Sequence, residues 1–234
     1  MASWDGGASV LANRVLPPSF INHPSLGKVR YELTEVSDDP DTQVAQTIAL
    51  MKRYALEDSS HPILINDASA AVQSMDPISD TFEYLRRNGG RGMQFVRDED
   101  IGSPFADGWR PLVEALIRPA DQALLSSPQG DCDDFSMYGA AHLLARGVPC
   151  SFATVAASDS DPSAYSHVYL VAYPKSGPYA GQRVPLDLSH GPYPGWEVPN
   201  RFGKRAEWGV DHTSDILLWG LALGGAYLLY KGLN

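Results

Sequence analysis

The spacing of hydrophobic and polar residues predicts a strand and two helices in the first part of the chain. Residues 29–36 alternate between apolar and polar side chains, which is typical of a β-strand. Asp39 and Asp76 are each followed by proline, and this pair of residues favours a helix N-terminus. Apolar residues recur on one helical face after Asp39, and two adjacent glycines end the second helix.

The pattern changes around residue 130. A third helix is predicted to begin at Cys132, directly after a Gly-Asp turn. Small residues on its inner side, Gly139 and Ala140, would let this helix approach a sheet closely. After the helix, apolar residues form short runs typical of strands. The predicted strands cover residues 150–156, 165–173 and 183–188. Helices followed by antiparallel strands predict an α+β fold.

The two ends of the chain differ from this middle part in composition. Residues 1–28 are rich in Pro, Gly, Ser and Asn, so we expect an extended arm there. Residues 29–200 are expected to form the folded domain, and residues 201–213 a linker. Residues 214–234 are expected to form a hydrophobic helix, because residues 216–230 carry no charge and are apolar on all sides.

This hydrophobic helix has two interpretations. It could be a membrane tail anchor with aromatic residues near both ends, although 15 residues span only about 22 Å of a hydrocarbon core about 30 Å thick. It could instead pack within an oligomer or a larger assembly, where Gly220 and Gly224 allow close helix contact. The protein is accordingly expected to be membrane-associated or virion-associated, and otherwise cytoplasmic.

Composition and charge limit the function classes. The 234 residues are 44% hydrophobic and 20% charged, so a packed core is expected. The formal net charge of −10 would repel a phosphate backbone, which argues against a nucleic-acid partner. The two cysteines, Cys132 and Cys150, do not make a disulfide framework or a zinc spacing. We therefore expect no metal and no cofactor.

Cys132 has the clearest potential for chemistry. A helix N-terminus presents unpaired N–H groups and a partial positive charge, and both favour the nucleophilic thiolate. The alternative is that Cys132 is a small buried hydrophobic residue, as most free cysteines are.

Two later residues complete a set suited to nucleophilic catalysis, which needs a base and a group that orients it. His167 lies near the start of an apolar strand, and Asp187 lies within the next one, where a carboxylate needs a partner. An imidazolium beside Cys132 would lower the pKa of the thiol below its free value of about 8.5.

Three blocks in this order resemble the transglutaminase-like cysteine protease superfamily, and most of all its small bacterial and phage-type members. They are Gly-Asp-Cys-Asp-Asp-Phe at 130–135, Ser-His-Val-Tyr at 166–169 and Val-Pro-Leu-Asp at 184–187. The likeness spans about residues 93–198 and implies a papain-like α+β core within residues 29–200. It also implies that Cys132 is the nucleophile, His167 the general base and acid, and Asp187 the residue that orients the histidine.

An oxyanion hole needs at least two donors. The backbone N–H of Cys132 is well placed because it lies at a helix start. Gln129 is the expected second donor, although it lies only three residues before the cysteine, closer than the glutamine of papain-like proteases. Trp109 is another candidate, because some relatives use an indole N–H.

Other polar residues have more than one interpretation. Asp131, Asp133 and Asp134 could ligate a hard cation such as Ca²⁺, or could complement the helix dipole. His190 falls in an irregular loop and is expected at the surface. His142 lies roughly 80° from Cys132 around the helix and is not expected to serve the same site.

These features predict a cysteine-dependent amide-bond hydrolase that works through a thioester and acts on a peptide or protein. Transglutaminase-type amine cross-linking uses the same triad and stays open. A third possibility is a non-catalytic structural or anchoring protein of a virion or membrane complex that keeps the fold and uses the tail through residues 216–230 for assembly.

The tail interpretation predicts the outcome of a membrane flotation assay. The full-length chain should float with lipid vesicles, and a variant without residues 214–234 should stay in the soluble fraction, because the apolar segment would be lost. Recovery of the full-length chain only in the soluble fraction would contradict a membrane anchor.

Overall fold

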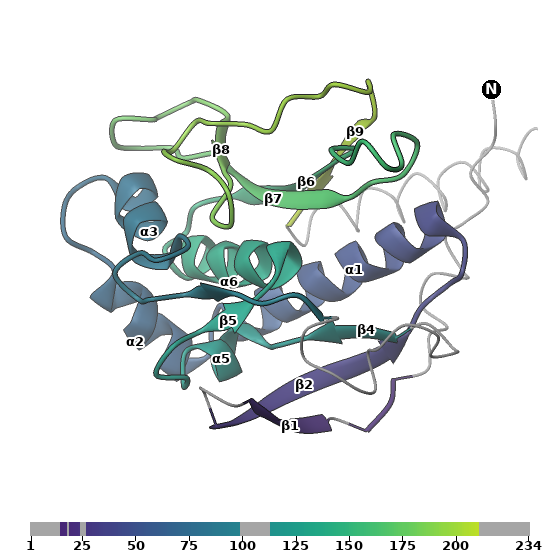
Figure 1. Cartoon of the computed structure of the whole chain (residues 1–234). Helices are drawn as coiled ribbons and strands as arrows, with labels where there is room; N and C mark the ends of the chain where they lie inside the picture. Colours follow the sequence, from purple (N-terminus) through teal and green to yellow (C-terminus); the bar gives the residue numbers. More distant parts are fainter. Residues whose placement is uncertain (1–14, 18, 24–26, 99–112, 211–234) are drawn as a thin grey trace, which may run out of the picture.

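The chain folds as α+β, with helices packed on small, mostly antiparallel sheets (Figure 1). The computed structural model describes residues 15–17, 19–23, 27–98 and 113–210. The predicted tail helix and Trp109 lie outside these residues. Among the described helices, none is both long and apolar enough to cross a membrane.

The largest sheet has four strands in the order β8-β7-β6-β9. Their bounds are Cys150–Val155 for β6, His167–Ala172 for β7, Val184–Leu186 for β8 and Arg205–Gly209 for β9. The predicted strands of this region are confirmed, with shorter bounds. The sequence predicted a linker over residues 201–213, but part of this segment forms β9. β9 pairs antiparallel with β6 and satisfies backbone groups that would otherwise be unpaired at the sheet edge.

A second sheet has the order β1-β2-β4 and lies on the other side of the helices (Figure 1). Its strands are Ser19–His23, Gly27–Glu35 and Val113–Leu116, and β2 confirms the strand predicted from alternation. β1 falls within the expected arm, where pairing with β2 makes a strand that composition does not reveal. A short parallel pair joins β3, Gln94–Phe95, to β5, Gln129–Gly130.

The described helices are α1 Pro40–Asp58, α2 Pro62–Ala70, α3 Pro77–Leu85, α5 Pro119–Gln122 and α6 Cys132–Ala145. The predicted starts of α1 and α3 are confirmed. Asp39 Oδ2 accepts from the Thr42 N–H at 2.9 Å, and Asp76 Oδ1 accepts from the Ile78 N–H at 3.1 Å. α2 begins at a His-Pro pair instead of Asp-Pro, and His61 Nδ1 accepts from the Ile63 N–H at 3.3 Å.

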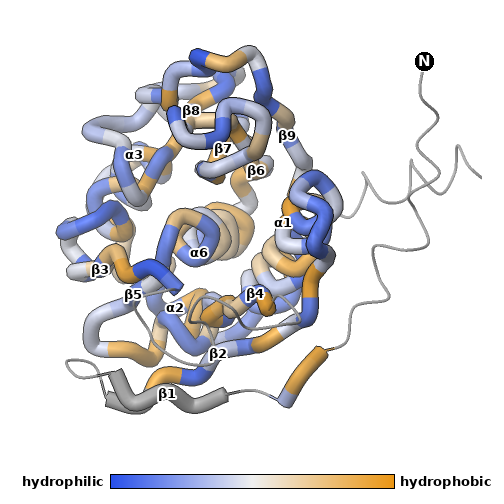
Figure 2. Tube along the Cα trace, turned by 45° about the vertical axis from the view of Figure 1, so that its right-hand side comes forward, coloured by the Kyte–Doolittle hydropathy of each residue, from blue (hydrophilic) through white to orange (hydrophobic). Residues whose placement is uncertain are grey.

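Helix α6 is the centre of the fold. Figure 2 shows it near the middle of the molecule, surrounded by the other elements. It contacts β7 on the side of the four-stranded sheet, and α1, α2 and α3 also pack on it. Because it is covered on several sides, every residue from Asp134 to Leu143 is buried.

Gly139 allows α6 to lie directly on this sheet. A Cβ atom there would clash with Leu188 Cδ1 and would lie 3.0 Å from Leu170 Cδ2. The close approach expected from the small residues of this helix is therefore confirmed. It fixes the height of the helix N-terminus, and so of Cys132, above the end of β7.

The substitution Gly139→Ala should destabilise the protein. Alanine favours a helix by about 1 kcal/mol over glycine, but overpacking a core typically costs about 1–3 kcal/mol. We expect a lower free energy of unfolding in urea. Gly90→Ala is the matched control, because its Cβ would have its nearest neighbour at 3.6 Å. A Gly139→Ala protein at least as stable as the wild type would contradict the packing described.

Candidate active site

Cys132 is the first residue of α6, as predicted, and its side chain is half-buried. The N-cap is Asp131, whose Oδ1 accepts from the Asp133 N–H at 3.3 Å. Gly130 just before it has φ of +142° and lies against the Asp134 side chain, so no residue with a Cβ fits there. The Gly-Asp-Cys turn therefore places the thiol at the helix N-terminus.

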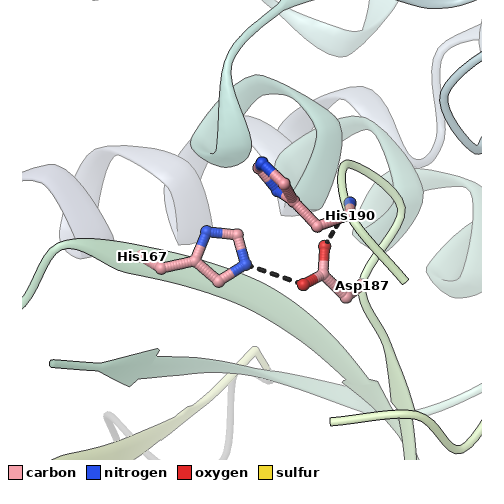
Figure 3. Close-up of side chains that lie close together, drawn as sticks. All are labelled: His167, Asp187 and His190. Carbon is pink, nitrogen blue, oxygen red and sulfur yellow. Dashed lines mark hydrogen bonds and ion pairs between the residues drawn. The ribbon is translucent and has the colours of Figure 1, made fainter. Parts of the chain in front are cut away.

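His167 and Asp187 are brought together by strand pairing. His167 begins β7, Asp187 directly follows β8, and these two strands pair antiparallel, which confirms the predicted adjacency. His167 Nε2 lies 2.8 Å from Asp187 Oδ2, while the other ring nitrogen points away from the carboxylate (Figure 3).

The second carboxylate oxygen of Asp187 is also fully engaged. Oδ1 accepts from the Ser189 N–H at 3.2 Å, the Ser189 hydroxyl at 3.0 Å and the His190 N–H at 2.9 Å. Burial alone would raise the pKa of Asp187, but its hydrogen bonds, led by that from His167, lower the pKa below its usual value. An ionised carboxylate only accepts, so His167 Nε2 carries the hydrogen and Nδ1 is left to take a proton.

Cys132 and His167 line one open pocket of about 510 Å³. Phe95, Arg97, His190 and Trp196 also contribute to its wall. The Val168 backbone, next to His167, and the Asp187 carboxylate both act electrostatically on the Cys132 thiol. The structure therefore brings the three predicted triad residues to one place.

The expected low pKa of the Cys132 thiol is wrong in this structure. Burial raises the pKa well above its usual value, and the nearby Asp131 adds to the rise. The Val168 backbone lowers the pKa of the thiol, but this effect is weaker than the two that raise it. The resting thiol is therefore protonated, and it must give up its proton as it reacts.

His190 is exposed, as the sequence predicted, and it also lines the pocket, which the sequence analysis did not predict. Its ring lies perpendicular to that of His167, with 5.1 Å between the ring centroids, and edge-on to Phe95 at 5.2 Å. Its Nδ1 lies 2.9 Å from the Ser189 hydroxyl. Burial, followed by the neighbouring His167, lowers the pKa of His190. The three-residue spacing from Asp187 is the signal that could have located it, because the His190 N–H caps that carboxylate.

Gln129 does not line the pocket, so its predicted oxyanion role is not supported. Its side chain is fully buried, and Nε2 donates to the Tyr31 hydroxyl at 3.3 Å on the other sheet. The backbone of Gln129 is held by the Gln122 amide. The Cys132 N–H remains the candidate donor among the described residues.

His142 is excluded from the pocket, as predicted. Its buried Nε2 lies 3.0 Å from Asp67 Oδ2, and Tyr84 and Tyr138 donate to the same carboxylate. Burial lowers the pKa of His142. This polar network ties α2, α3 and α6 together and has a structural role.

Two groups of described residues have ligand atoms within 4.8 Å of one another and could hold a metal ion. One is His167, Asp187 and His190, but there the histidine and carboxylate already bond to each other. The other is Asp131, Asp133 and Asp134. Burial raises the pKa of Asp133 and Asp134 well above the usual value, and Asp131 raises it further. This favours their protonated forms and lessens the negative charge beside Cys132.

No protein-family model matches the chain, and no curated protein or solved structure is similar to it. What the pocket can do chemically therefore has to be inferred from its own geometry.

The raised thiol pKa predicts how Cys132 reacts with iodoacetamide. The alkylation rate, followed by mass spectrometry, should keep rising above pH 8.5, near the pKa of a free cysteine. Asp131→Asn should shift this rise to lower pH, because it removes a negative charge and keeps an N-cap. Buried Cys150 serves as an internal control. A wild-type rate that levels off below pH 8 would contradict the expected shift.

Proposed function

We propose that this protein is a cysteine-dependent amide-bond hydrolase, a peptidase or amidase that works through a thioester. The observation that carries the proposal is the 2.8 Å hydrogen bond between His167 and Asp187 at a pocket lined by Cys132. We also propose that the chain belongs to the transglutaminase-like superfamily with a papain-like core. The order of its three sequence blocks, and an α6 helix that lies on an antiparallel sheet, support this.

The proposed reaction begins with proton transfer from the Cys132 thiol to His167 Nδ1, while Sγ attacks the amide carbonyl carbon. The oxyanion that forms lies near the Cys132 N–H. His167 then returns the proton to the leaving amine, the C–N bond breaks, and a thioester remains. Water, deprotonated by His167, attacks the thioester and releases the acid and the thiol. Asp187 holds the imidazole and stabilises its positive charge.

Hydrolysis is preferred over amine cross-linking because the pocket is open to solvent. Cross-linking needs an acceptor amine to reach the thioester before water does. The same triad would carry out both reactions, so adding a primary amine to the assay separates them.

A non-catalytic structural or anchoring role is the second candidate. The observation in its favour is the raised pKa of the Cys132 thiol. Burial and the nearby Asp131 both disfavour the thiolate that catalysis needs. In that case Cys132 would be a half-buried packing residue, and the His167–Asp187 bond would be structural.

Cleavage of a peptide-amide library should depend on the triad. Cys132→Ala should abolish turnover, and Asp187→Asn should lower kcat by a factor of about 10² or more, because the imidazole would no longer be held in the required tautomer. Cys150→Ala is the matched control, since this second cysteine is buried outside the pocket. Turnover that survives Cys132→Ala, in a variant with wild-type thermal stability, would contradict the proposal.

A further inference from the structure

Two arginines beside the pocket have no acidic partner in the part of the chain that the structure describes. Most of the described arginines have a carboxylate oxygen within 4.0 Å, and these are Arg30, Arg53, Arg86, Arg91, Arg118, Arg183, Arg201 and Arg205. Arg146 instead donates to Pro77 O and the Thr81 hydroxyl. Arg87 and Arg97 have no ion-pair partner among the residues that the structure describes.

Both arginines lie close to the pocket lining. Arg97 is an exposed lining residue. Arg87 is also exposed, and its guanidinium lies 5.4 Å from the ring centroid of Phe95, another lining residue. The backbone N–H of Arg87 donates to Leu188 O at 2.8 Å, directly after Asp187. Both positive charges act on His190 and help to lower its pKa, after burial and His167.

Among the described residues, no carboxylate oxygen lies within 4.0 Å of the Arg87 or the Arg97 guanidinium. The chain carries a net charge of −10, and acidic side chains to pair with are therefore plentiful. In the pocket itself, Asp131 lies on the Cys132 side, and Asp187 is buried and bonded to His167. Arg97 therefore presents to the pocket a guanidinium that has no ion-pair partner among the described residues, and guanidinium groups are well suited to bind a planar carboxylate.

We propose that Arg97, assisted by Arg87, binds a carboxylate of the acyl donor, so that the preferred substrate is an acidic peptide. The carboxylate is either a Glu or Asp side chain near the scissile amide or the free C-terminus of a short peptide. This inference rests on the proposed amide hydrolysis for its substrate, but the local field can be measured without turnover.

The field is measured by comparing two alkylating agents at Cys132. Iodoacetate carries a carboxylate, whereas iodoacetamide is neutral and reacts at the same sulfur. At low ionic strength and pH 9, Arg97→Gln should lower the ratio of the iodoacetate to the iodoacetamide rate by about threefold. Arg87→Gln should lower it less, because Arg87 does not line the pocket. Arg53→Gln is the control, with the same change in net charge on α1, away from the pocket lining.

An unchanged ratio of the iodoacetate to the iodoacetamide rate in Arg97→Gln would overturn the inference. This holds whether or not the protein hydrolyses amides. If instead the ratio falls but Cys132→Ala leaves turnover unchanged, the anion site stands and the hydrolase proposal fails.

Two pairs of peptides identify the source of the carboxylate. One pair differs by Glu against Gln near the scissile amide, and the other by a free against an amidated C-terminus. Wild-type kcat/KM should be higher for the charged member of one pair, and Arg97→Gln should remove that preference. Equal kcat/KM within both pairs would overturn the substrate assignment.

Discussion

The candidate site depends on the direct packing of α6 on β7. Gly139 lets the helix lie against Leu170 and Leu188 with no side chain between them. The first helical turn is tied to the strand by Ser136, whose hydroxyl donates to the backbone oxygens of Cys132 and Val168. Because the helix begins at the pocket, this packing decides which residue faces the end of β7.

The same burial that assembles the site also determines its electrostatics. It raises the pKa of the Cys132 thiol, whereas the hydrogen bonds to Asp187 keep that carboxylate ionised. In the proposed reaction, a protonated thiol that shares a pocket with a carboxylate-held histidine would transfer its proton during attack and not form a thiolate beforehand. Acidic residues are part of the turn that positions Cys132, and burial raises the pKa of Asp133 and Asp134 well above the usual value, which favours their neutral forms.

Local signals in the sequence were enough to predict much of this arrangement. The capped starts at Asp39 and Asp76, and the meeting of His167 with Asp187, follow from short-range patterns and strand adjacency. The position of Gln129 did not follow, because its partner Tyr31 lies 98 residues away. The thiol pKa was also mispredicted, since burial and the position of Asp131 are properties of the folded state. The pocket position of His190 was missed, although its spacing of three residues from Asp187 lets its N–H donate to that carboxylate.

The most direct test of the account is to trap the acyl-enzyme with an activated ester and to locate the acyl group by mass spectrometry. Acylation should occur on Cys132. Its rate should fall strongly in His167→Gln and in Asp187→Asn, and the double variant should be hardly slower than His167→Gln alone, because the two residues act as one unit. Acylation elsewhere, or at the wild-type rate in His167→Gln, would contradict the central claim that these three residues form a catalytic site.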